Sequence, residues 1–141
     1  MAIKQLSIFV ENKQGSLYEI TDALAAAGIN LRSMCVADTS NYGIVRIIAD
    51  DPDKAKALLD QQGQAANVRP VNAFAVPDQP GGLSSVLHIL EDGGVDIEYM
   101  YALITSESGK AYSVMRTGNT EETDRILVEN GIELLDESKL K

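Results

Sequence analysis

The sequence predicts an α+β fold made of two repeats of a β-α-β-β-α-β unit, and three observations support this. The segment QGSL at residues 14–17 recurs as PGGL at 80–83, an offset of 66 residues, and GINL at 28–31 recurs as GVDI at 94–97. Each copy alternates β-branched runs with segments of helical period. The chain of 141 residues therefore divides into two related units of about 70 residues each.

The first unit is predicted over residues 1–69. Its elements follow in the order strand 3–10, helix 17–27, strands 29–37 and 44–48, and helix 51–62. Asp51 followed by Pro52 is a strong helix start, because a carboxylate caps the first turn and proline fits there. The offset between the two repeats places the last strand of this unit near 64–68, but the residues there have low strand propensity. Alternatively, the chain passes through Arg69 and Pro70 almost directly into the next strand.

The second unit is predicted over residues 70–141. Its elements follow as strand 71–76, helix 83–92, strands 95–104 and 111–116 around a turn at 106–109, helix 120–130 and a last strand 132–135. Asn119 and Glu122 resemble a capping box at the start of the last helix. This order is that of the ferredoxin-like split βαβ fold, in which both helices cover one face of an antiparallel sheet.

Composition excludes several classes of function. The chain carries 12 Lys and Arg against 21 Asp and Glu, a net charge of −9, whereas nucleic-acid binders need clustered basic residues. Anionic membranes are disfavoured for the same reason, and no apolar run approaches the roughly 20 residues that span a bilayer. The first residues lack the apolar core of a signal peptide, and Cys35 is the single cysteine. We therefore expect a cytoplasmic protein that binds neither nucleic acid nor membrane.

The two glycine loops are the candidate binding feature. A strand, a glycine loop and a helix in succession present unpaired backbone N–H groups at a helix N-terminus, where an anion is stabilised. Asn12 lies beside the first loop and Asp78 beside the second, so an ammonium acceptor accompanies each carboxylate site. This combination suits a free α-amino acid. From spacing alone, the alternative that these residues only form tight turns and caps stays open.

No catalytic constellation accompanies the loops. His88 is the single histidine and Cys35 has no second cysteine nearby, so neither metal ligation nor acid–base chemistry has its usual set of residues. We interpret His88 as a structural or surface residue and Cys35 as a small buried hydrophobe. We expect no enzyme activity, no metal and no cofactor.

The second loop carries a resemblance to a known family. Residues 76–83 read VPDQPGGL and are followed by GVDI at 94–97 and by Met100; this pattern resembles the signature of the ACT domain, a small ferredoxin-like module that regulates amino-acid metabolism by binding amino acids. The first copy, VENKQGSL at 10–17, lacks the proline, so the second loop is predicted to be the better formed. The resemblance covers nearly the whole chain, twice.

The resemblance implies a function and a set of site residues. It implies that a free amino acid binds between paired units, with the loop of one unit facing the second strand of its neighbour. It also implies a free-standing sensor or a regulatory subunit that regulates an enzyme or regulator partner. We further expect a homodimer, because the exposed sheet edges of small units favour pairing. The alternatives are a module that uses pairing only for oligomerisation and a small enzyme on this fold. The implicated residues are Asn12, Gly15, Ser16, Leu17, Asn30, Leu31, Asp78, Gly81, Gly82, Leu83, Asp96 and Ile97.

Overall fold

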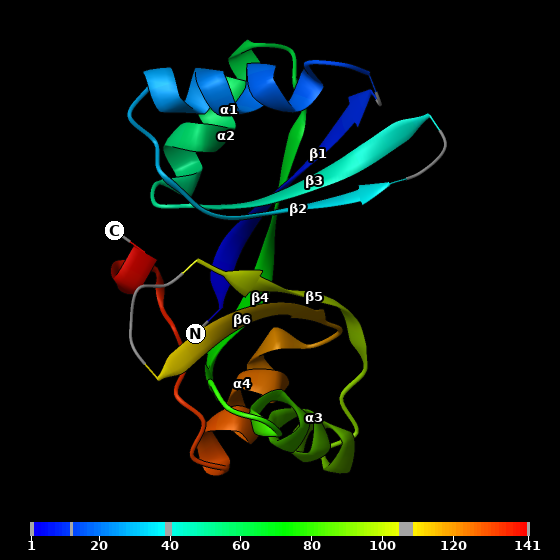
Figure 1. Ribbon diagram of the computed structural model, residues 1–141, viewed down its shortest axis with the longest axis vertical. Helices are drawn as coiled ribbons and strands as arrows, with labels where there is room; N and C mark the ends of the chain where they lie inside the picture. Colours follow the sequence, from blue (N-terminus) through cyan, green and yellow to red (C-terminus); the bar gives the residue numbers. More distant parts are fainter. Residues whose placement is uncertain (1, 12, 39–40, 105–108, 141) are drawn as a thin grey trace. The chain divides into compact units, whose positions relative to one another are not determined.

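A computed structural model describes residues 2–11, 13–38, 41–104 and 109–140 (Figure 1). Its internal contacts group the chain into a first unit, Lys4–Arg69, and a second unit, Pro70–Lys139. Ala2 and Ile3 group with the second unit, and Leu140 groups with the first. Each unit is described by itself.

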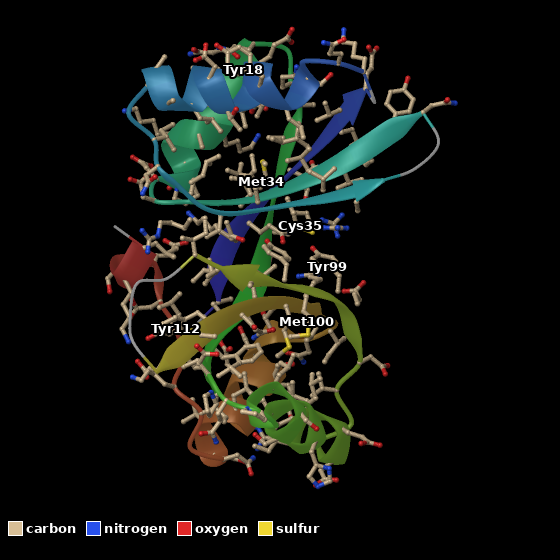
Figure 2. All side chains as sticks on the ribbon, in the orientation of Figure 1. Tyr18, Met34, Cys35, Tyr99, Met100 and Tyr112 are labelled. Carbon is tan, nitrogen blue, oxygen red and sulfur yellow. The ribbon has the colours of Figure 1, made fainter. Side chains whose placement is uncertain are left out.

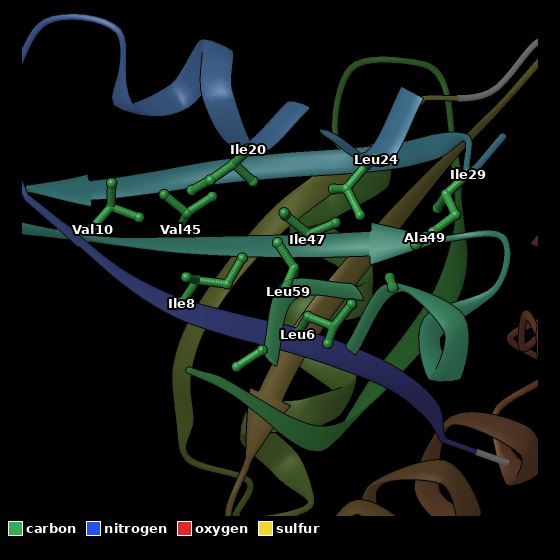
Figure 3. Close-up of a cluster of buried hydrophobic side chains, with 12 residues drawn as sticks. Leu6, Ile8, Val10, Ile20, Leu24, Ile29, Val45, Ile47, Ala49 and Leu59 are labelled. Atoms are coloured by element: carbon green, nitrogen blue, oxygen red, sulfur yellow. The ribbon is translucent and has the colours of Figure 1, made fainter. Parts of the chain in front are cut away.

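The first unit is a sheet covered on one face by two helices (Figure 1). Its strands are hydrogen-bonded in the order β2-β3-β1-β4, and β3 runs antiparallel to both β1 and β2. The helical face of the sheet and the helices enclose an aliphatic core around Leu6, Ile8, Leu24, Ile47 and Leu59 (Figure 3). The elements are β1 (Ile3–Glu11), α1 (Ser16–Ala26), β2 (Leu31–Asp38), β3 (Tyr42–Ala49), α2 (Pro52–Gln61) and the start of β4.

The second unit repeats this plan. Its strands are hydrogen-bonded in the order β4-β6-β5, with β6 antiparallel to both neighbours. Phe74, which is fully buried, is the largest side chain of a core that also contains Leu90, Met115 and Leu127. The elements are β4 (Ala66–Pro77), α3 (Gly82–Asp92), β5 (Ile97–Leu103), β6 (Lys110–Thr117), α4 (Thr120–Glu129) and the short 3₁₀ helix η1 (Glu137–Leu140).

The predicted fold class is confirmed, and the two boundary strands differ in instructive ways. β4 is one strand of 12 residues, Ala66–Pro77, so the strand expected near 64–68 forms from Ala66 onward and continues directly through Arg69 and Pro70 into the strand predicted over 71–76. The predicted last strand over 132–135 is wrong. It is reduced to an isolated bridge between Phe74 and Leu134. The Asp136 carboxylate accepts the Ser138 N–H at 3.0 Å, a turn that ends the extended segment.

Asp60 connects the end of α2 to the start of β4. Its carboxylate accepts hydrogen bonds from Lys56 Nζ at 2.6 Å and from the Ala66 N–H at 3.3 Å. The hydrogen bond from Lys56, followed by that from the Ala66 N–H, holds the pKa of Asp60 below its ordinary value of 3.8. Because the pKa is lowered by folding, the ionised carboxylate stabilises the fold above pH 3.8, and this stabilisation is lost as the pH falls from there through the folded-state pKa.

Replacing Asp60 with asparagine is therefore expected to lower stability near neutral pH and to have a smaller effect in acid. Urea unfolding of the wild type and of Asp60→Asn, from about pH 7 to about pH 3, measures this difference. A difference that stays constant over this range would show that the Asp60 carboxylate does not contribute through its charge.

Candidate functional site

The helices that follow the glycine loops begin differently from the other two. The N-cap positions of α1 and α3 are Gly15 and Gly81, with φ of 86° and 81°, and neither helix has a side-chain cap. In contrast, Asp51 accepts the Lys54 N–H at 3.1 Å at the start of α2. Asn119 accepts the Glu122 N–H at 3.0 Å at the start of α4. The chain thus caps two helices with side chains and leaves two open.

Among the described residues, four backbone donors at these two helix starts have no acceptor. The first hydrogen bonds of these helices run from the Glu19 N–H to the Gly15 carbonyl at 3.0 Å and from Ser85 to Gly81 at 2.9 Å. The N–H groups of the second and third residues of each helix have no acceptor among the described residues; these are Leu17, Tyr18, Leu83 and Ser84. Unpaired N–H groups and the positive end of the helix dipole favour an anion here.

A hollow of about 370 Å³ lies beside the first loop. Its lining is mostly polar and comes from β1, the loop, α1, the start of β3 and the segment after α2. Tyr42 is directly opposite Glu11 in the β1–β3 register, which places its ring at this end of the sheet. The lining residues are Phe9, Val10, Glu11, Lys13, Ser16, Glu19, Tyr42 and Gln64.

Ser16 is the unusual residue of this hollow. The residue is 7% exposed, yet its hydroxyl has no hydrogen-bond partner among the described residues. Lys13 and Glu11 form an exposed ion pair at 3.4 Å. Leu17 and Tyr18, the residues that carry the free N–H groups, are 39% and 70% exposed; Tyr18 projects from the side of α1 away from the sheet (Figure 2).

The second loop is packed more closely at the equivalent position. A Cβ atom added to Gly82 would lie 2.0 Å from the Pro77 carbonyl oxygen, so only glycine fits without a backbone shift. The loop-closing hydrogen bond from the Gly82 N–H to Gln79 is 3.0 Å long, against 3.4 Å for the bond from Ser16 to Lys13. Asp78, Gly81 and Leu83 are exposed.

The predicted residues on the second strands lie at the other end of the helices. Asn30 follows α1, and its N–H donates to Asp50 Oδ1 at 3.1 Å, while Leu31 opens β2. Asp96 and Ile97 follow α3 and line a separate hollow of about 440 Å³. Each helix has 11 residues and is about 16 Å long. Within a unit, the loop and strand residues are therefore not brought together.

Sequence reasoning identified the loops but missed most of the hollow. Asn12 lies outside the described residues, as does the turn segment 106–108. Lys13 and Glu19 are close in sequence to the predicted loop residues, and this proximity is the signal that could have indicated them as part of the lining. Tyr42 and Gln64 are distant in sequence, and no local signal places them there. Among the described residues, no group of three or more His, Cys, Asp or Glu is arranged to hold a metal ion.

Two ferredoxin-like units, each with an uncapped glycine loop before its first helix, define the class of this protein. The family described as an ACT domain pair matches residues 1–141. The chain belongs to this family, which confirms the resemblance seen in the sequence. Within the described ranges, no helix combines the length and apolar character required to cross a membrane.

Solved structures support the same fold. A protein from Bacteroides thetaiotaomicron is similar at 41% identity with a TM-score of 0.92, covering 99% of this chain and 96% of that one. The regulatory subunit of aspartate kinase from Thermus thermophilus is similar at 14% identity and a TM-score of 0.68, over 91% and 92% of the two chains. The same subunit from Thermus flavus has 15% identity and a TM-score of 0.61, over 89% and 90%. The comparison with curated proteins finds no match.

Proposed function

We propose that this protein binds a free amino acid at its glycine loops and regulates amino-acid metabolism through a partner, without catalytic activity of its own. The observation that carries the proposal is the contrast between the helix starts. α2 and α4 are capped by Asp51 and Asn119, whereas α1 and α3 begin after an αL glycine and have no side-chain cap. An uncapped helix start with free N–H groups favours an α-carboxylate.

The proposed site uses the residues implicated by the family resemblance. The loop residues bind the α-carboxylate, and residues of a second strand complete the site across a pairing of units. The proposed binding residues are Asn12, Gly15, Ser16, Leu17, Asn30, Leu31, Asp78, Gly81, Gly82, Leu83, Asp96 and Ile97. Because loop and strand residues lie at opposite ends of a helix within each unit, the proposal requires that pairing.

A homodimer and a regulated enzyme or regulator are part of the proposal. The strands β2 and β5 are edge strands of their sheets, and unpaired edges favour association with another chain. The likeness to regulatory subunits of aspartate kinase is consistent with regulation of an enzyme. A ligand that binds one arrangement more tightly shifts the population toward it by no more than that difference in binding free energy.

Adding the correct amino acid is expected to raise the Tm of the purified protein. A ligand at about 100 times its Kd stabilises a folded protein by roughly 2.7 kcal/mol, which thermal unfolding detects readily. The experiment screens the natural amino acids one at a time after denaturation and refolding have removed any bound ligand. The D-enantiomer of each chiral hit provides the matched control.

A flat screen would overturn the proposal and favour the alternative in which pairing serves only oligomerisation. Equal stabilisation by both enantiomers would also contradict it, because a site that holds the carboxylate, the ammonium group and the side chain at separate points distinguishes the two hands of an amino acid.

A further inference from the structure

The two glycine loops differ in a way that indicates what they recognise. At the first residue of the helix the first loop has Ser16, whereas the second has Gly82. No Cβ fits at Gly82, because the Pro77 carbonyl oxygen would lie 2.0 Å away. The glycine at this position therefore has a sufficient packing explanation. The first loop accommodates a whole serine side chain, and its closing hydrogen bond from Ser16 to Lys13 is longer, at 3.4 Å against 3.0 Å.

Within the part of the chain that the structure describes, the Ser16 hydroxyl lacks the hydrogen-bond partner that a buried hydroxyl normally has. Ser16 is 7% exposed, and its Oγ atom has no hydrogen bond among the described residues. In contrast, the hydroxyl of Ser85, in the first turn of α3, has a partner: it donates to the Gly82 carbonyl at 2.8 Å. Buried polar groups are nearly always paired. Ser16 lines the hollow, and a rotation about its Cα–Cβ bond moves Oγ among three staggered positions, so a ligand in the hollow can supply the missing partner.

The charges around the hollow restrict the ligand. Glu11 is paired with Lys13 at 3.4 Å, while Glu19 has no ion-pair partner among the described residues. The lining thus contains two carboxylates, one ammonium group and the Gln64 carboxamide. A second carboxylate on the ligand would be repelled, whereas an ammonium or neutral polar group would be accepted.

We propose that the hollow at the first loop, and not the second loop, recognises the ligand side chain, and that the ligand is an amino acid with a neutral polar or basic side chain. The inference rests on the proposed function. Within it, the N–H groups of Leu17 and Tyr18 bind the α-carboxylate, Glu19 accepts from an ammonium group, and Ser16 Oγ hydrogen-bonds to a polar group of the ligand. Acidic amino acids are rejected by Glu11 and Glu19.

The test is calorimetric titration of wild type, Ser16→Ala and Ser84→Ala with the hit from the amino-acid screen. Ser84 is exposed in the first turn of α3 and is the matched control. We expect Ser16→Ala to raise the Kd about tenfold, with a ligand-free Tm equal to or above that of the wild type. The Tm is not lowered because the substitution removes an unpaired buried hydroxyl. Ser84→Ala is expected to change neither quantity.

The other outcomes separate the inference from the proposed function. If an amino acid binds the wild type but Ser16→Ala retains its affinity, the inference is wrong and the proposed function stands. The inference is also wrong, and the proposed function again stands, if the hit is glutamate or aspartate, because Glu11 and Glu19 then do not exclude a ligand with a second carboxylate. If no amino acid binds the wild type, the proposed function fails and the inference fails with it.

Discussion

Replacing Gly82 with alanine is expected to lower the free energy of unfolding by about 3 kcal/mol, at the upper end of the usual range for overpacking. The added Cβ would lie 2.0 Å from the Pro77 carbonyl oxygen. That oxygen belongs to the end of β4, and it also accepts the Gln79 N–H at 2.9 Å, so it cannot move without disturbing the loop. Urea unfolding of wild type and Gly82→Ala measures the loss.

Two matched substitutions make this prediction specific. Ser16→Ala, at the same position of the first unit, introduces no clash and is expected to be neutral or slightly stabilising. Gly81→Ala places a Cβ in open space but at φ 81°, so it is expected to cost only the αL penalty of about 1–2 kcal/mol. If Gly82→Ala cost no more than Gly81→Ala, the close packing of the second loop against Pro77 would be disproved.

The second large effect is expected at Asn72, which lies in a buried polar cluster of the second unit. Asn72 Nδ2 donates to Asp124 Oδ1 at 2.7 Å and to the Thr120 carbonyl at 2.9 Å. Its Oδ1 accepts from the Thr117 hydroxyl at 2.9 Å. Because these groups are buried, Asn72→Ala deprives a carboxylate and a hydroxyl of a partner and is expected to cost about 2–4 kcal/mol.

A double-mutant cycle with Asp124→Ala checks the origin of this loss. The double variant has neither the Asp124 carboxylate nor the Asn72 amide, so the hydrogen bond between them is lost only once, and the double variant is expected to be more stable than the sum of the single effects implies. Additive effects would show that the pair is not coupled. In the first unit, Leu6 stands at the position equivalent to Asn72 and Ala49 at the position equivalent to Thr117, and both are fully buried.

The internal repeat allowed most of the fold to be predicted. Helix starts at Asp51 and Asn119 were identified from their side chains, and both side chains cap the first turn as expected. The sequence predicts the first hairpin from the turn at 41–43 and the β-branched run that follows it, and the second from the turn at 106–109. The sequence predicts a full strand at 132–135, whereas the structure has only an isolated bridge between Leu134 and Phe74. Nothing in a short apolar run indicates that the pairing stops at one bridge.

The candidate site was less predictable than the fold. The offset of the repeat located both loops, and the PGGL segment favoured the second loop. The sequence does not show that Gly82 is pressed against Pro77, because that contact depends on the backbone path of the loop. Nor does it show that Tyr42 and Gln64 meet beside Ser16, since the three come from separate elements. Both features depend on tertiary packing, and they are the reason that we propose the first loop as the site that recognises the ligand side chain.

The central claim is that the open start of α1 binds an amino acid, and amide NMR tests it most directly. A titration of ¹⁵N-labelled protein with the hit from the screen reports on every backbone N–H separately. We predict that the largest shift changes occur at Leu17 and Tyr18, whose N–H groups have no acceptor among the described residues. Unchanged Leu17 and Tyr18 signals, with a saturable response elsewhere in the chain, would contradict the claim.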